Sequence, residues 1–215
     1  SGGVTGQAEL EVRPRDISAM VEAIRAANGL PALSGAIVTR DGLVAVGASG
    51  TRRASGGQAV TLEDRWHIGS NLKAVTAALA GVAVTRGRIG WTTTVAQAFP
   101  ELAATIRPEY RDVTLEDLLS NRGRIRNDPP ASAYAGATAR AQRESLVRWA
   151  LAAPPIGPRG SYHYSNPSFA MAGAMVERAL NGTYEELLAS ELAAPLGVTG
   201  LGWGAAAPAG ASTQP

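Results

Sequence analysis

A long apolar segment is the feature that most restricts how this chain can fold. Residues 74–84 (AVTAALAGVAV) carry almost no polar side chain. Aliphatic side chains recur around it at helical spacing, at Leu72, Val75, Leu79 and Val82. A helix end is indicated by Arg86-Gly87. Because a helix with so little polar surface cannot face water on most sides, the sequence predicts a largely buried helix here.

The start of this helix holds Lys73, the only lysine of the chain; the other 19 basic residues are arginines. An arginine cannot lose its proton in a protein, whereas burial and neighbouring groups can neutralise a lysine amine. Ser70 stands three residues earlier, on the same helix face. The pair predicts a serine nucleophile beside a buried lysine of lowered pKa, in the first helical turn. The alternative is a lysine that merely snorkels from a helix end.

Composition limits the classes of partner. The chain has 215 residues, 45% of them hydrophobic, which suits one large domain or a domain with an insertion. The net charge is +2, and the densest basic cluster, NRGRIR at 121–126, has no interleaved aromatic residue. It therefore predicts a solvated loop and no nucleic-acid partner. No apolar run reaches the roughly 18–20 residues of a membrane span, so we expect none.

Cysteine usage and the first residues bear on metals and localisation. The chain has no cysteine, which excludes thiolate metal sites. It begins SGG without a charged and then apolar leader. It is thus interpreted as a cytoplasmic protein, a processed mature form or a trimmed chain, with an exported (periplasmic or extracellular) location favoured.

The expected order of elements is one helix, two strands and then mostly helices, an α+β arrangement. A helix is predicted at 15–27, and strands at 35–39 and 43–48 flank Asp41-Gly42, a strong hairpin signal. Further helices are predicted from a Thr114 cap with Asp117, at 139–152, at 166–180 and from Thr183. Residues 205–215 read as a linker-like tail.

A second motif, Tyr164-Ser165-Asn166, lies in the stretch Gly157–Gly204. With Ser70 and Lys73 it resembles the two motifs, S-x-x-K and Tyr-Ser/Ala-Asn, of the penicillin-recognising serine hydrolases: class C β-lactamases, D-alanyl-D-alanine peptidases and related carboxylesterases. The flanking TLEDRWHIGSNLKAVTA and YEELLASELAAPLGVTG are similar as well, so the likeness runs from about Leu30 to Gly204. It implies a β-lactamase-like α+β fold, with an antiparallel sheet flanked by helices and a mostly helical subdomain.

The resemblance also assigns roles. Ser70 would attack a carbonyl to give a covalent acyl-enzyme, and Lys73 and Tyr164 would relay its proton. Physically, a phenol near a cation is stabilised as its anion. Asn166 would orient the substrate or hold Lys73. The acyl substrate stays open among a β-lactam, a D-amino-acid peptide and a small ester, and no metal or organic cofactor is expected. The alternative function is a non-catalytic binding or regulatory module of the same fold.

Two departures from the family are visible. Where relatives read Leu-Leu-Ser-His-Thr-Ser-Gly-Leu, this chain has Arg122 and Arg124 in place of small residues, so an unusual substrate preference is expected. No Lys/His-Thr/Ser-Gly triplet follows Gly204. We therefore expect one incomplete domain over 1–215, with the helix and hairpin in about 1–60 and the motifs in about 61–204. The C-terminal strands would be missing and could come from a second polypeptide.

Other mechanisms find less support in the residues. His67 and His163 invite comparison with a Ser-His-Asp hydrolase, but IGSNL around Ser70 lacks the second glycine of a G-x-S-x-G elbow. Neither histidine has a partner at i+4 for a metal site. Both are interpreted as structural, and Asp128 as a loop residue.

Overall fold

The computed structural model of the chain describes residues 13–207. The described residues form two compact units, 13–67 with 202–207, and 68–201. We call them the sheet unit and the helical unit. The predicted tail at 205–215 lies mostly outside the described residues.

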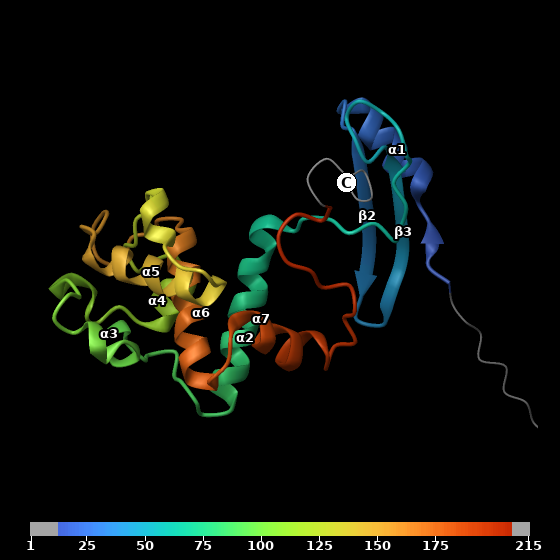
Figure 1. The fold of residues 1–215 in the computed structure, drawn as a ribbon. Helices are drawn as coiled ribbons and strands as arrows, with labels where there is room; N and C mark the ends of the chain where they lie inside the picture. Colours follow the sequence, from blue (N-terminus) through green and yellow to red (C-terminus); the bar gives the residue numbers. More distant parts are fainter. Residues whose placement is uncertain (1–12, 208–215) are drawn as a thin grey trace, which may run out of the picture. The chain divides into compact units, whose positions relative to one another are not determined.

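The sheet unit contains β1 (Arg15–Asp16), α1 (Ser18–Ala27), β2 (Ala32–Thr39) and β3 (Gly42–Gly50) (Figure 1). The strand order is β1-β3-β2 in the described residues, with β2 antiparallel and β1 parallel to β3. β2 is thus an edge strand. The predicted hairpin is confirmed, but its turn is one residue off: Thr39 pairs with Gly42, so the turn residues are Arg40 and Asp41. Gly42 opens β3 with φ +126°, a conformation that favours glycine.

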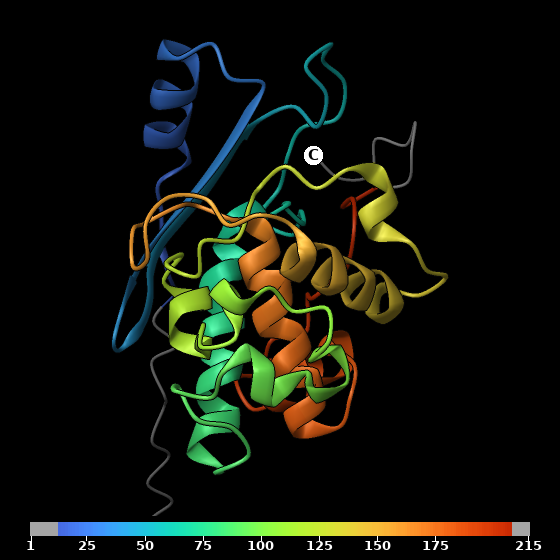
Figure 2. The ribbon, with the colours of Figure 1, turned by 90° about the vertical axis from the view of Figure 1, so that its left-hand side faces the viewer.

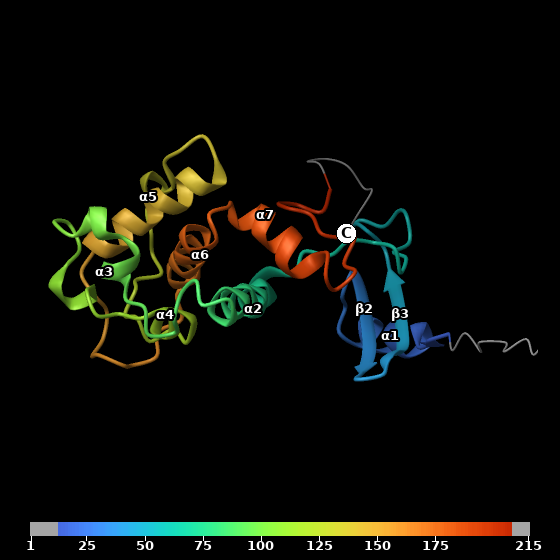
Figure 3. The ribbon, with the colours of Figure 1, turned by 90° about the horizontal axis from the view of Figure 1, so that it is seen from below.

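Helix α1 packs against the sheet (Figure 3), and the chain at its start comes close to β3 at Gly47. A Cβ on Gly47 would lie 2.6 Å from the Ser18 backbone N, so only glycine allows this approach. Val21 is buried on the inner side of the helix. The prediction of a helix from residue 15 was wrong at its start. Arg15 and Asp16 pair with β3, and an Asp16 carboxylate oxygen accepts a hydrogen bond from the Ser18 N–H, where the helix begins.

The helical unit begins with a 3₁₀ turn, Gly69–Asn71, that leads into α2. Its α-helices are α2 (Leu72–Thr85), α3 (Val95–Ala98), α4 (Leu115–Leu119), α5 (Ala139–Ala152), α6 (Asn166–Leu180) and α7 (Tyr184–Leu188), which continues into a π-helical turn, Ala189–Ala193. Short 3₁₀ turns lie at Pro100–Leu102, Pro108–Tyr110 and Ala131–Tyr134. The predicted Thr114 cap is confirmed as a capping box with Asp117, and the predicted spans of α5 and α6 are confirmed as well.

Helix α6 lies between α2 and α5 at the centre of this unit (Figure 2). The core is fully buried along the facing sides of these helices, at Leu79, Ala80 and Ala83 of α2, Met171 and Met175 of α6, and Leu151 of α5. The predicted burial of α2 is therefore confirmed on that side. It was wrong for Ala74 and Ala78, which are exposed.

A buried ionic cluster links α5, α6 and α7. The Glu177 carboxylate is 1% exposed and accepts hydrogen bonds from Arg143 Nη2 (2.7 Å) and from the backbone N–H of Tyr184 (2.7 Å). Arg143 also binds Glu185, and this contact lowers the pKa of Glu185. The ring of Tyr184 is thereby held so that its hydroxyl meets Thr76 Oγ1 of α2 at 2.8 Å.

Candidate active site

Four of the predicted site residues converge in the helical unit. Ser70 Oγ lies 2.6 Å from Tyr164 Oη and accepts a hydrogen bond from Lys73 Nζ at 3.2 Å. Lys73 Nζ also donates to Asn166 Oδ1 at 2.7 Å, across 93 residues of sequence. The predicted convergence of Ser70, Lys73 and Tyr164 within hydrogen-bonding distance is therefore present.

Two helix starts bring these residues together. Ser70 occupies the 3₁₀ turn before α2, and Lys73 is the second residue of α2. Asn166 is the first residue of α6, whose N-cap Ser165 accepts a hydrogen bond from the Ser168 N–H at 3.1 Å. Free N–H groups at both starts place positive partial charge near the cluster.

The electrostatics of the cluster favour a phenolate. The pKa of Tyr164 lies below its ordinary value, first because of the neighbouring Lys73 and then because of the Ser70 hydroxyl. Lys73 Nζ also lies 4.7 Å from the centroid of the Tyr164 ring and 5.5 Å from that of Phe169. The predicted burial of Lys73 was wrong, since its side chain is only half-buried and Ser70 is exposed.

The basic cluster at 121–126, together with the adjoining Asn127, supports the Tyr164 loop. Its prediction as a solvated loop was wrong, because Asn121 is 8% exposed and Ile125 is fully buried. The Asn121 carbonyl accepts from the His163 N–H, and Asn121 Oδ1 accepts from the Ser165 N–H. Asn127 Oδ1 accepts from the Asn166 N–H at 2.8 Å. The sequence analysis gave neither asparagine a role; for Asn121, which has φ +58°, the one available signal was the tolerance of asparagine for left-handed backbone.

Arg122 and Arg124, which replace small residues of the family pattern, bind the loop before Tyr164. Arg122 Nη1 donates to the Gly160 carbonyl at 3.3 Å, and Arg124 Nε donates to the Gly157 carbonyl at 3.0 Å. Arg124 has φ +62°, in the left-handed region that the glycine of the pattern would adopt easily. Both side chains line a cavity of about 80 Å³ that also includes Asp112 and Arg159. Their effect on substrate preference stays a prediction.

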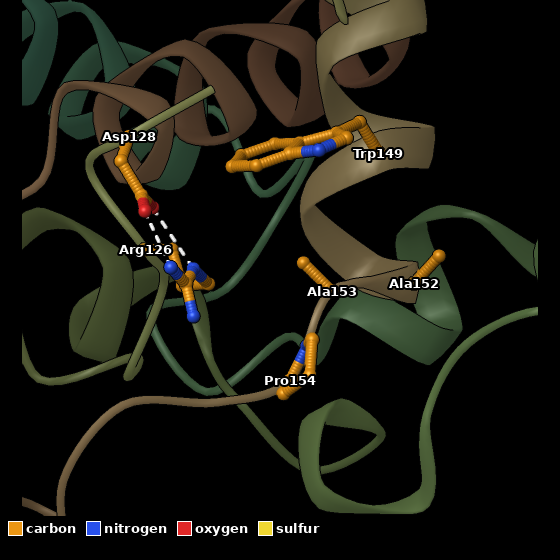
Figure 4. Close-up of a pocket in the computed structure, with 6 residues that line it drawn as sticks. All are labelled: Arg126, Asp128, Trp149, Ala152, Ala153 and Pro154. Carbon is orange, nitrogen blue, oxygen red and sulfur yellow. Dashed lines mark hydrogen bonds and ion pairs between the residues drawn. The ribbon is translucent and has the colours of Figure 1, made fainter. Parts of the chain in front are cut away.

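The side chains of His67, His163 and Asp128 take no part in the hydrogen bonds that join Ser70, Lys73, Tyr164 and Asn166. His163 Nε2 contacts Ser161 Oγ at 2.9 Å, while His67 is exposed in the sheet unit. Asp128 is an exposed loop residue that pairs with Arg126. Figure 4 shows this pair opposite the Trp149 ring across a pocket of about 430 Å³.

Residues 13–207 present neither a metal-binding cluster nor a membrane-spanning helix. No group of three or more His, Asp or Glu side chains in this range is arranged to hold a metal ion. None of the described helices combines the length and apolarity needed to cross a membrane.

Comparison with known proteins identifies the family. A sequence model of the Beta-lactamase family matches residues 17–214. The chain belongs to the β-lactamase family. In this β-lactamase-family chain the S-x-x-K and Tyr-Ser-Asn motifs occupy the cluster described above.

Solved structures give the same fold. A class C β-lactamase is 19% identical with a TM-score of 0.72, over 85% of this chain and 48% of that one. A protein from Bacteroides dorei DSM 17855 assigned as a β-lactamase is 23% identical with a TM-score of 0.68, over 84% of this chain and 50% of that one. SurE is 23% identical with a TM-score of 0.67, over 87% of this chain and 42% of that one. These likenesses confirm the predicted β-lactamase-like α+β fold, and this chain spans half or less of the length of those proteins.

Proposed function

We propose that Ser70 is the nucleophile of a serine hydrolase that forms a covalent acyl-enzyme. The observation that carries the proposal is the contact of Ser70 Oγ with both Tyr164 Oη (2.6 Å) and Lys73 Nζ (3.2 Å). A serine hydroxyl is a weak nucleophile until an adjacent base takes its proton. The substrate class is a β-lactam, a D-amino-acid peptide or a small ester.

Tyr164 is the proposed base and Lys73 its supporting cation. The lowered pKa of the Tyr164 phenol favours the phenolate, which accepts the Ser70 proton as the Oγ–carbon bond to the substrate forms. The same phenol then returns the proton to the leaving group. Water subsequently attacks the acyl-enzyme, again with Tyr164 as base, and releases Ser70. In this scheme Lys73 holds the Ser70 hydroxyl beside the phenol, since its Nζ donates to both Ser70 and Asn166.

Asn166 has two proposed tasks. Its Oδ1 fixes Lys73, and its amide N–H₂ can donate to a substrate carbonyl. The side chain is exposed, so a substrate can reach it. An anionic tetrahedral intermediate also needs backbone donors, and losing one of two such donors typically costs ~10²–10³ in rate. We therefore expect the 215-residue chain alone to react slowly if a second donor comes from another polypeptide.

The free edge of β2 is the proposed place where a second polypeptide joins the sheet unit. In the described residues β2 pairs with β3 alone, and an unpaired edge invites strand addition. Ile37 and Val38 on this strand are 50% and 69% exposed. Mass spectrometry of the purified protein, with light scattering, tests this proposal. A bound second peptide supports it, and a stable monomer without one argues against it.

Covalent labelling tests the proposed reaction. The chain is incubated with a fluorophosphonate and separately with a fluorescent penicillin, and the adduct is mapped by peptide mass spectrometry. We expect the adduct on Ser70 and none in Ser70→Ala, whereas Ser190→Ala, which alters an exposed serine of the same unit, should label normally. Reversible penicillin binding without an adduct would favour the non-catalytic module, and an adduct on another serine would refute the assignment.

A further inference from the structure

Tyr164 needs external support to keep its position. It lies in a loop without helix or strand hydrogen bonds of its own, and its side chain is 41% exposed. An exposed tyrosine on a loop ordinarily samples several rotamers. Its hydroxyl nevertheless lies within 2.6 Å of Ser70 Oγ. Contacts from neighbouring residues must therefore hold the backbone of Tyr164 in place.

Asn121 binds the backbone on both sides of Tyr164. Its carbonyl oxygen accepts the His163 N–H at 2.8 Å, and its Oδ1 accepts the Ser165 N–H at 2.9 Å. Ser165 is fully buried, so its N–H has no access to bulk water if the amide oxygen is removed. The two bonds bracket a single residue, Tyr164.

Asn121 is itself rigidly held. It follows the C-terminus of α4 with φ +58°, a left-handed conformation that asparagine tolerates better than most residues. Its N–H donates to the Leu118 carbonyl at 3.2 Å, and the next N–H, of Arg122, donates to the Asp117 carbonyl at 2.7 Å. Leu118 is fully buried in the core, so the end of α4 is anchored.

We infer that Asn121 is a positioning residue that holds the Tyr164 phenol against Ser70 and Lys73 through its hydrogen bonds to the flanking backbone. It touches neither the proposed nucleophile nor a substrate, and it acts through Tyr164. The kinetic consequence rests on the proposed hydrolase function, whereas the geometric consequence does not.

Three variants separate this role from a general effect on folding. Asn121→Gly keeps the left-handed backbone and the carbonyl acceptor but removes Oδ1. Asn121→Asp restores an oxygen acceptor and also tolerates left-handed backbone. Asn181→Gly is the matched control, because Asn181 ends α6 with φ +56° and lies outside the cluster.

The first readout is the titration of the Tyr164 phenol, followed by NMR of ¹³Cζ-tyrosine protein and assigned with Tyr164→Phe. In the parent chain Lys73 and Ser70 face this phenol, and its pKa should lie below the ordinary ~10. We expect the pKa to rise toward its ordinary value in Asn121→Gly. Asn121→Asp adds a negative charge that itself disfavours a nearby phenolate, so its rescue is judged by the acylation rate below, which should return toward the parent value. Asn181→Gly should leave the phenol pKa unchanged.

The second readout is the rate of Ser70 acylation by a fluorophosphonate. We expect about a 10–100-fold loss in Asn121→Gly with little change in probe affinity, because small displacements of a reacting group are costly. A folded Asn121→Gly whose Tyr164 titrates as in the parent chain would overturn the inference. If instead the titration shifts as expected but the parent chain forms no adduct, the positioning role stands and the hydrolase proposal fails.

Discussion

Removal of one phenol oxygen at Tyr164 should abolish most acylation while leaving the fold intact. Tyr164→Phe deletes the atom that lies 2.6 Å from Ser70 Oγ and keeps the ring beside Lys73. A positioned general base typically contributes 10²–10⁴-fold, so the acylation rate should fall by about that factor, or about 2.7–5.4 kcal/mol of barrier. Because the side chain is 41% exposed, we expect less than about 0.5 kcal/mol of change in the free energy of unfolding.

The chain offers a matched control in Tyr184→Phe. Tyr184 Oη also contacts a hydroxyl of α2, Thr76 Oγ1 at 2.8 Å, but it is buried in the core. In this variant Thr76 Oγ1 keeps its hydrogen bond to the Leu72 carbonyl, so this hydroxyl still has a partner. The loss of one net hydrogen bond should cost about 1 kcal/mol of stability. Acylation should remain within a few-fold of the parent rate.

The acylation rate and the free energy of unfolding can both be measured without a substrate that is turned over. The acylation rate constant follows from time-resolved mass spectrometry of the fluorophosphonate adduct, and the free energy of unfolding from urea titration. The two variants should separate, with Tyr164→Phe losing rate and Tyr184→Phe losing stability. If Tyr164→Phe reacts within threefold of the parent chain, Tyr164 is no base and the proposed proton route is wrong.

Three further perturbations have defined outcomes. Lys73→Arg keeps the charge but puts a planar guanidinium where the compact lysine Nζ contacts Ser70. Because a displacement of about 1 Å at a reacting group can cost about 100-fold in rate, the rate of adduct formation in the same assay should fall at least about 100-fold. A rate equal to that of the parent chain would make Lys73 a structural residue. The acylation rate should rise with pH through a Tyr164 pKa below the ordinary ~10, and a pH–rate profile that persists in Tyr164→Phe would contradict this. Hydrogen bonds from Arg52 and Thr61 lower the pKa of Asp64 in the sheet unit. The ionised carboxylate therefore stabilises the fold above the unfolded pKa near 3.8, and this stabilisation is lost as the pH falls through the folded pKa. Urea titrations should show that the free energy of unfolding falls less at acid pH in Asp64→Asn than in the parent chain.

The sequence predicted correctly those helices and strands whose ends are marked by a capping residue or a turn. Helix α5 begins after Thr138 and α6 after Ser165, and both residues cap the next N–H groups with their side chains. The hairpin strands were found because two apolar runs flank a short turn. Strand β1 was missed because two residues in parallel pairing leave no periodic pattern.

The support of the site could not be predicted in the same way. The S-x-x-K spacing placed Ser70 and Lys73 on one helix face by local geometry alone. By contrast, Asn121 is buried where it binds the loop before α6, 44 residues away at Ser165, and Ile125 belongs to the hydrophobic core of the helical unit. Arginines on either side of these residues made the segment look solvated. Which neighbours a loop residue meets is set by tertiary packing and leaves no signal in a local window.

The geometry around Lys73 Nζ accounts for a lysine at this position, because three side chains surround this one atom. Lys73 Nζ donates to Ser70 Oγ and Asn166 Oδ1 and lies 4.7 Å from the Tyr164 ring centroid. A compact ammonium on a flexible stem can serve all three directions, whereas a guanidinium directs its donors within one plane. Elsewhere the chain uses arginine for flat, bidentate partners, as Arg143 does with Glu185. The choice of lysine at position 73 therefore follows from the geometry of this site, and Lys73→Arg is the substitution that tests it.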